Sequence, residues 1–129
     1  MSNESILITG ISGQDGLFLT DHLLSLNSSN LKVYGISRQN PEIVLKKLNS
    51  LNNVERNVEI LNIDLTNPEA TLNLIKRSKP SQIYNLSGPS SVYDSLSNAK
   101  YFKDTINLIF DNLTNSCIKE KLFPTFFQA

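Results

Sequence analysis

The sequence has few of the residues that stabilise secreted proteins or build metal centres. Its 129 residues include one cysteine, one histidine, one methionine and no tryptophan. A single cysteine excludes an intramolecular disulfide, so a cytoplasmic location is expected. No set of side chains has the composition of a metal site. No apolar run approaches the roughly 20 residues that cross a bilayer, and the first residues do not resemble a signal peptide.

The chain also lacks an excess of charge of either sign. Twelve lysines and arginines balance twelve aspartates and glutamates. A nucleic acid or a membrane surface is therefore not expected as a partner, because no long-range field of one sign would attract it. Hydrophobic residues make up 40% of the chain, which is enough for the core of one domain.

Short β-branched runs alternate with longer helical stretches along the chain. Strands are expected at residues 5–9, 32–37, 58–63, 82–86 and 122–127, and helices at about 14–26, 41–51, 68–79 and 99–119. This alternation predicts right-handed βαβ units and an α/β fold with a doubly wound parallel sheet in the order 3-2-1-4-5. Such a sheet places a ligand crevice at the carboxyl ends of strands one and four.

Three of the five glycines mark the passage from the first strand into the first helix, the last of them in the opening turn of the helix. Gly10, Gly13 and Gly16 have the spacing of a phosphate-binding turn. Gly10 would allow the tight turn, Gly13 would let a pyrophosphate approach the backbone, and Gly16 would let the helix pack on the strand. The alternative is an ordinary strand-to-helix turn.

Arg38 follows the next strand, at the place where an NAD site usually has a carboxylate. An arginine can pair with a 2′-phosphate, so NADP is favoured over NAD; the alternative is a solvated surface arginine. Asp64 and Leu65 follow the third strand. The carboxylate of Asp64 could accept a hydrogen bond from an adenine amino group or cap the next helix.

A turn of small residues follows the fourth strand, at the expected ligand crevice. Small side chains there would let a nicotinamide ribose pass close to the backbone, whereas the alternative is a plain Gly-Pro turn. The turn consists of Leu86, Ser87, Gly88, Pro89 and Ser90.

Several stretches resemble the GDP-mannose 4,6-dehydratases, which are members of the extended short-chain dehydrogenase/reductase family. They are ITGISGQDG at 8–16, GISR at 35–38, DLTN at 64–67, IYNLSG at 83–88 with SSV at 90–92, and FFQA at 126–129. The resemblance implies a Rossmann-like, NADP-dependent lyase of nucleotide-sugar metabolism. Its reaction would convert GDP-mannose to GDP-4-keto-6-deoxymannose.

The resemblance also implies a set of cofactor-binding residues. Tyr101 matches a family tyrosine that contacts the cofactor, although an aromatic ring packed on the sheet edge is equally compatible with the sequence. Pro89 replaces a frequent glutamine, and Ile109 and Phe110 stand where the family usually has a glycine. The implied residues are Gly10, Ile11, Ser12, Gly13, Gln14, Asp15, Gly16, Arg38, Asp64, Leu65, Leu86, Ser87, Gly88, Pro89, Ser90 and Tyr101.

The catalytic residues of the family have no match in this chain. Family members use a Tyr-x-x-x-Lys pair, a Thr or Ser and a Glu, and none of the four tyrosines here is followed by lysine at the fourth position. We therefore expect residues 1–129 to be a partial NADP-binding domain, truncated after strand five and inactive alone. The second half of the sheet and the substrate domain would be absent.

Other interpretations remain open at this point. The chain could be a non-catalytic NADP-binding module, or half of a split enzyme complemented by a C-terminal half. It could also belong to another NAD(P)-dependent sugar-nucleotide epimerase or dehydratase. An unprotected fifth strand and three phenylalanines in the last seven residues predict oligomers or poor solubility.

Overall fold

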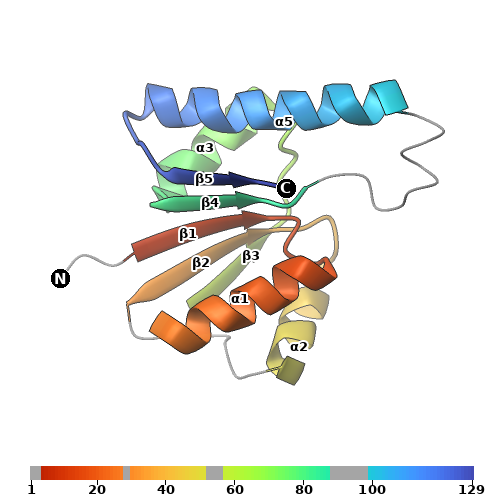
Figure 1. Ribbon diagram of the computed structural model, residues 1–129, viewed down its shortest axis with the longest axis vertical. Coiled ribbons are helices and arrows are strands. Elements are labelled where there is room, and N and C mark those ends of the chain that lie inside the picture. Colours follow the sequence, from red (N-terminus) through yellow and green to blue (C-terminus); the bar gives the residue numbers. More distant parts are fainter. Residues whose placement is uncertain (1–3, 28–29, 52–56, 88–98) are drawn as a thin grey trace.

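Five parallel strands form one sheet at the centre of the molecule (Figure 1). The computed structural model describes residues 4–27, 30–51, 57–87 and 99–129. The strand order is β3-β2-β1-β4-β5, as the sequence predicts. The strands are β1 (Glu4–Thr9), β2 (Leu31–Ile36), β3 (Val58–Leu61), β4 (Gln82–Asn85) and β5 (Thr125–Gln128).

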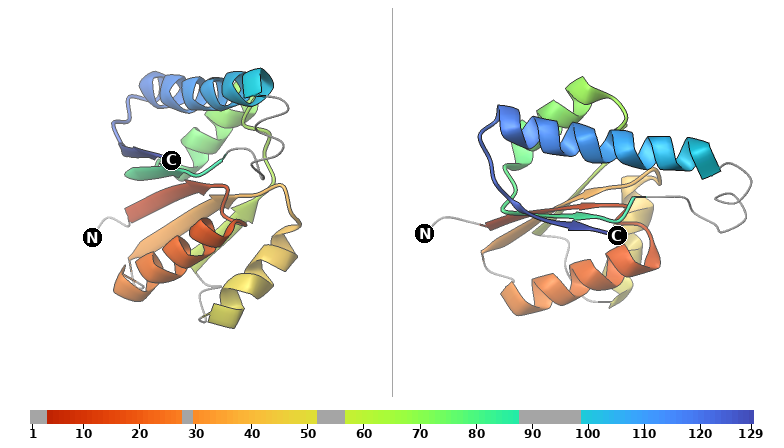
Figure 2. Two further views of the ribbon diagram at one scale, coloured as in Figure 1. Left: turned by 45° about the vertical axis from the view of Figure 1, so that its right-hand side comes forward. Right: turned by 45° about the horizontal axis from the view of Figure 1, so that its top comes forward.

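Helices cover both faces of this sheet. The two on one face are α1 (Gln14–Asn27) and α2 (Pro41–Leu51), and the two on the other face are α3 (Pro68–Ser78) and α5 (Ala99–Lys119). Figures 1 and 2 show this arrangement from three directions. The strand arrows point toward the edge at which α1 begins, so the first strand-to-helix turn lies at the carboxyl end of the sheet.

The core consists of two apolar clusters, one on each face of the sheet. Ile6 and Ile8 contribute to the cluster beneath α1 and α2, whereas Leu7 contributes to the one beneath α3 and α5. All three side chains are buried because successive residues of a strand point to opposite faces and both faces of β1 are covered. This burial explains why the strand is a continuous apolar run rather than an alternating one.

Three strands are shorter than the sequence pattern predicts. Expected strands 58–63 and 82–86 end at Leu61 and Asn85, and β5 begins at Thr125 rather than at Leu122. Each missing residue lies beyond the register that pairs neighbouring strands, which for β4 and β5 runs from Gln82↔Thr125 to Asn85↔Gln128. An apolar residue beside a strand can pack on the core without joining the hydrogen-bonded ladder, as Ile63 and Leu122 do.

The ends of α3 follow local side-chain chemistry. Asn67 is the N-cap: its side-chain oxygen accepts hydrogen bonds from the backbone N–H groups of Glu69 and Ala70, and Pro68 follows it. Lys79 ends the helix in the left-handed conformation at φ 42°, and its N–H donates to the carbonyl of Ile75. Pro80 comes next, and a proline is common just after a helix because it cannot continue the helix.

The apolar stripe predicted for α1 is only partly buried. Leu24 lies in the core, and Leu17, Leu19 and Leu23 pack against it, but Leu26 is exposed. Residues two positions apart in an α-helix are separated by about 200° around its axis, so Leu26 lies on the face of α1 opposite to the buried Leu24. Across the described residues, no helix combines the length and hydropathy needed to cross a lipid bilayer.

Candidate functional site at the carboxyl end of the sheet

Gly10 makes the first turn possible for two independent reasons. Its φ of +69° lies in the left-handed region, which side chains disfavour. A Cβ at this position would also stand 2.8 Å from the carbonyl oxygen of Leu86. The turn after β1 therefore packs directly on the backbone that follows β4, at the boundary between the two halves of the sheet.

Gly16 and Gly13 meet different surroundings. A Cβ at Gly16 would lie 2.7 Å from both the Gly10 oxygen and the Ile11 Cα, so the glycine lets the first turn of α1 fold onto the strand-to-helix turn itself. A Cβ at Gly13 would meet only the Gly10 oxygen, at an ordinary 3.5 Å. Packing within the chain therefore accounts for Gly10 and Gly16, and it leaves open space at Gly13.

The turn is anchored to the sheet by Ile11. Its side chain is fully buried, and it fills the space that the missing side chain of Gly35 leaves on β2. Its N–H donates to the carbonyl of Ile36 over 3.1 Å. In contrast, Gly13, Gln14 and Asp15 are exposed and Ser12 is half-buried. The side chain and the N–H of Ile11 are therefore both engaged within the chain, whereas the next four residues present surface.

The start of α1 differs from the starts of α2 and α3. Asn40 accepts a hydrogen bond from the N–H of Glu42 at the start of α2, and Asn67 caps α3. The residue before α1 is Gly13, which has no side chain to act as a cap. The first N–H groups of a helix have no partners within it and carry partial positive charge. This turn can therefore offer backbone N–H groups to an anion.

Arg38 lies just beyond β2, in a segment held by several hydrogen bonds. Its side chain is exposed, and its carbonyl accepts a hydrogen bond from the Asn62 amide at 3.4 Å. The preceding residue, Ser37, donates its N–H to the Leu61 carbonyl and accepts one from the Gln39 N–H. The backbone that carries the guanidinium is thus fixed to the end of β3.

Asp64 does not cap α3, so that alternative for its role is wrong. Its Oδ1 accepts hydrogen bonds from the Thr66 hydroxyl at 2.6 Å and the Thr66 N–H at 3.0 Å, in a turn that precedes the cap. The pKa of Asp64 is lowered by these two hydrogen bonds and, to a smaller degree, by the charge of Arg38. Asp64 and Arg38 therefore belong to one neighbourhood at the ends of β3 and β2.

Two buried polar side chains hold the backbone of Leu65 by hydrogen bonds to its carbonyl group. Its carbonyl accepts hydrogen bonds from the Asn112 amide on α5 at 2.9 Å and from the Thr71 hydroxyl on α3 at 3.2 Å. Neither residue is among the predicted site residues. No local pattern in the sequence marks Asn112 or Thr71, because the carbonyl that each of them binds lies outside its own helix.

The predicted segment after β4 is described only in part. Leu86 and Ser87 are half-buried and lie against Gly10, whereas Gly88, Pro89 and Ser90 fall outside the described residues. Tyr101, in the first turn of α5, is 66% exposed, and its ring contacts that of the neighbouring Phe102. It therefore does not pack on the sheet edge, and that alternative is wrong.

The single cysteine and the single histidine lie on helices, away from the first turn. Cys117 is buried in the core, and burial raises the pKa of its thiol. His22 is exposed on α1. Within the described ranges, His, Cys, Asp and Glu side chains form no group of three that could hold a metal ion.

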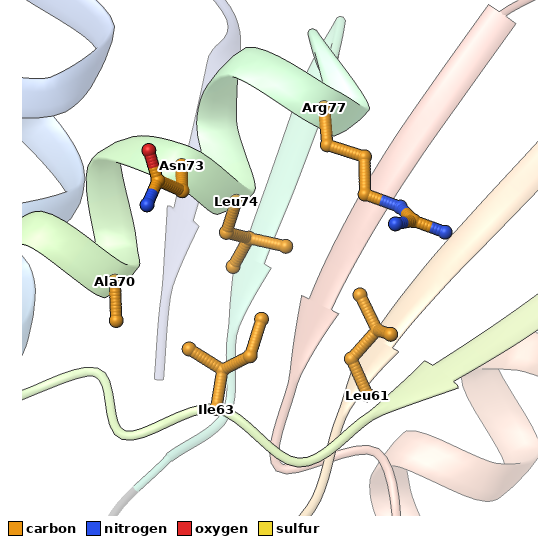
Figure 3. A pocket seen from close by; sticks show the side chains of 6 residues that line it. All are labelled: Leu61, Ile63, Ala70, Asn73, Leu74 and Arg77. Atoms are coloured by element: carbon orange, nitrogen blue, oxygen red, sulfur yellow. The ribbon is translucent and has the colours of Figure 1, made fainter.

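A separate cavity of about 470 Å³ lies between β3 and α3 (Figure 3). It is apolar along the strand and carries the Arg77 guanidinium at one end, which pairs with Glu59. None of the predicted site residues lines it. Its walls are Leu61, Ile63, Ala70, Asn73, Leu74 and Arg77.

A doubly wound parallel sheet with a tight glycine turn from β1 into α1 defines the Rossmann-like class of NAD(P)-binding enzymes. Solved structures of this class share the fold. The chain superimposes on UDP-glucose 4-epimerase of Thermotoga maritima with a TM-score of 0.73 and 20% identity, covering 96% of this chain and 37% of that one. For UDP-glucose-4-epimerase of Stenotrophomonas maltophila, solved with bound NAD, the TM-score is 0.77 at 12% identity, covering 93% and 35%.

The sequence identifies the family within this class. Residues 7–127 match the model of the GDP-mannose 4,6 dehydratase family, and the chain belongs to that family. It is 34% identical to human GDP-mannose 4,6 dehydratase over 103 residues, and 31% identical to the enzyme of Yersinia enterocolitica over 105 residues. These matches cover 76% and 78% of this chain, which spans 27% of the length of each relative.

Proposed function

We propose that residues 1–129 form the NADP-binding part of a GDP-mannose 4,6-dehydratase, which acts on a sugar nucleotide. The observation that carries the proposal is the glycine turn. Gly10 and Gly16 are required by contacts within the chain, but Gly13 faces open space at the start of a helix that has no side-chain cap before it. A pyrophosphate accounts for that space, because it needs close approach to backbone N–H groups.

Once the pyrophosphate is placed at the glycine turn, the other predicted residues can be assigned to the remaining parts of the cofactor. The pyrophosphate would contact residues 10–16, the adenine would border Asp64 and Leu65, and the nicotinamide ribose would follow 86–90 toward Tyr101. Arg38 would pair with the 2′-phosphate and so select NADP over NAD. The Arg38 side chain is exposed, and the backbone that carries it is held to the end of β3, which leaves the guanidinium accessible to a phosphate.

Titration of the purified chain with NADP and NAD, followed by calorimetry, tests the cofactor. We expect NADP to bind more tightly than NAD. Arg38→Met should weaken NADP binding by about 10- to 100-fold, since a charge-assisted hydrogen bond contributes roughly 1.5–3 kcal/mol. NAD binding should be unchanged. Equal loss for both cofactors would contradict a 2′-phosphate site at Arg38.

Turnover is a separate question from binding. The sequence contains no Tyr-x-x-x-Lys pair. Incubation of these 129 residues with GDP-mannose and NADP should therefore yield no 4-keto-6-deoxy sugar, although the cofactor binds. Formation of that product would contradict the assignment of this chain as the cofactor-binding part alone.

A further inference from the structure

The cavity between β3 and α3 has apolar walls and one charged end (Figure 3). Leu61 and Ile63 point toward the helix, and Ala70 and Leu74 point back toward the strand. Apolar walls with a few polar groups are the usual composition of a small-molecule site, and about 470 Å³ lies within the usual range of roughly 300–1,000 Å³ for such sites. The cavity is therefore large enough for a ligand of its own.

The apolar walls are only partly covered by the chain itself. β3 is an edge strand of the sheet, and Leu61 and Ile63 are half-buried although both side chains are large and apolar. Leu74 is buried, whereas Ala70, one turn earlier on the same face of α3, is half-buried. An apolar group in the cavity would remove the remaining surface of these side chains from water, which favours binding.

The charged end of the cavity has more positive than negative charge. The Glu59 carboxylate on β3 pairs with the Arg77 guanidinium through Oε1 and with the Lys32 ammonium through Oε2, the latter at 3.8 Å. These three side chains together carry one excess positive charge. Lys32 also lies over the ring of Tyr34, with its Nζ 5.5 Å from the ring centroid. An anion at this end would therefore be attracted.

Arg77 keeps hydrogen-bond donors for such an anion. Its side chain is 59% exposed, and one terminal nitrogen, Nη2, makes the contact with Glu59. A guanidinium has five N–H donors in a planar fork that matches a carboxylate. Because Glu59 is shared between two cations, a carboxylate from a ligand would match two cations with two anions.

We propose that this cavity binds a small molecule with an apolar body and one carboxylate group. The apolar body lies among Leu61, Ile63 and Leu74, and the carboxylate pairs with Arg77. A single carboxylate matches the single excess charge of the cluster. The inference goes beyond the proposed function, since none of the residues proposed to hold the cofactor lines the cavity.

Titration of the whole chain with 4-phenylbutanoate, followed by NMR of the leucine and isoleucine methyl groups, tests the site. We expect the methyl signals of Leu61, Ile63 and Leu74 to shift together, with a Kd of about 1 mM, as expected for a ligand with about 12 non-hydrogen atoms. 4-Phenylbutan-1-ol has the same apolar body without the charge. It should bind at least about 5-fold more weakly, because it cannot form a charge-assisted pair with Arg77.

Two substitutions separate the apolar part of the site from the charged part. Ala70→Leu fills the cavity with a side chain that favours a helix, and it should weaken binding of both compounds by more than about 10-fold. Arg77→Met removes the charge, and it should weaken binding of 4-phenylbutanoate by about 5- to 10-fold while leaving 4-phenylbutan-1-ol unchanged. Circular dichroism shows whether each variant is folded, and the comparison of the two compounds on the unaltered chain needs no variant.

Lys76→Met is the matched control, because Lys76 is the neighbouring exposed cation on α3 and does not line the cavity. It should leave the affinity for 4-phenylbutanoate within about 2-fold. Equal affinity for the acid and the alcohol, or equal losses in Lys76→Met and Arg77→Met, would overturn the inference. Methyl shifts confined to other residues would also overturn it.

A second copy of the chain on this face is the remaining outcome to distinguish. The signals of Leu61 and Ile63 would then respond to protein concentration and not to 4-phenylbutanoate, and the inference would be wrong. The test uses no cofactor. A failure here therefore leaves the proposed function intact, and failure of the chain to bind NADP leaves this inference intact.

Discussion

Gly10 is subject to two constraints that a methyl group would violate together. The left-handed φ costs an ordinary residue roughly 1–2 kcal/mol, and the contact with Leu86 is made by backbone that has little room to move. We expect Gly10→Ala to lower the free energy of unfolding by at least about 2 kcal/mol. Urea denaturation followed by circular dichroism measures this directly.

Gly13→Ala is the control for that prediction. It adds the same methyl group three residues later, where the nearest atom is at an ordinary distance. Stability should change by less than about 1 kcal/mol, while NADP binding weakens because the methyl group occupies the proposed path of the pyrophosphate. If both variants lose the same stability, the distinction between a structural and a ligand-facing glycine is wrong.

Thr66 controls the ionisation of Asp64. Its hydroxyl is the largest cause of the lowered pKa of Asp64, followed by its N–H, and the charge of Arg38 contributes less. Thr66→Val should therefore raise the pKa of Asp64 toward the ordinary value, and Arg38→Met should raise it by a smaller amount. Carbon-detected NMR titration of the Asp64 carboxyl measures both; a larger effect of Arg38→Met would contradict the order of causes.

The sign of the pH dependence follows from the lowered pKa. The charged carboxylate is favoured in the folded state, so the stabilisation is fully present above the ordinary pKa of aspartate, near about 4, and is lost as the pH falls through the lower folded value. The carboxylate is exposed, so solvent screens most of the effect. The difference between Thr66→Val and the unaltered chain should therefore shrink as the pH falls below about 4.

At the scale of single elements, two helices are followed by lysines in an unfavourable conformation. Lys79 and Lys121 both have positive φ, at 42° and 55°. Glycine adopts this conformation without strain and is the common residue after a helix. Lys79→Gly and Lys121→Gly should each raise the free energy of unfolding by up to about 1 kcal/mol.

Lys76→Gly separates this effect from a general effect of glycine. Lys76 is exposed within the last turns of α3, where glycine costs about 1 kcal/mol relative to a good helix former. Denaturation midpoints should therefore move in opposite directions for Lys76→Gly and Lys79→Gly. Movement in the same direction would show that backbone strain at Lys79 is not the controlling factor.

The elements themselves were largely readable from the sequence, whereas the site's supporting contacts were not. A strand buried on both faces is apolar throughout, so the run Ile6, Leu7 and Ile8 predicts such a strand, and the glycine spacing predicts the turn that follows. No comparable pattern predicts the contact between Thr9 and Asn85. Their partnership joins residues 76 positions apart and exists only because β1 and β4 pair in one particular register.

At the scale of the whole molecule, β5 lies at one edge of the sheet and carries exposed apolar side chains. Phe127 is 44% exposed and stacks on Tyr84, and Phe123 is 91% exposed just before the strand. An edge strand of this kind presents unpaired backbone groups and apolar surface together. We expect the 129-residue chain to self-associate at micromolar concentration, as sedimentation velocity would show.

Phe123→Ser should reduce this association without loss of stability, since the ring makes little contact with the rest of the molecule. Phe126→Ser provides the contrast. Its ring packs edge-on against Phe110 at 5.2 Å and adjoins the core, so its loss should lower the melting temperature. A monodisperse monomer in the unaltered chain would contradict the prediction.

The central position of β1 sets the order in which the protein can fold during synthesis. Its partner on one side, β2, is complete by residue 36, but its partner on the other side, β4, ends only at residue 85. The face beneath α1 and α2 can therefore close while the ribosome is still making the rest. Leu7 lies on the opposite face, which α3 and α5 cover. Until the ribosome has synthesised Leu113 on α5, that face of the sheet exposes apolar side chains to which chaperones can bind.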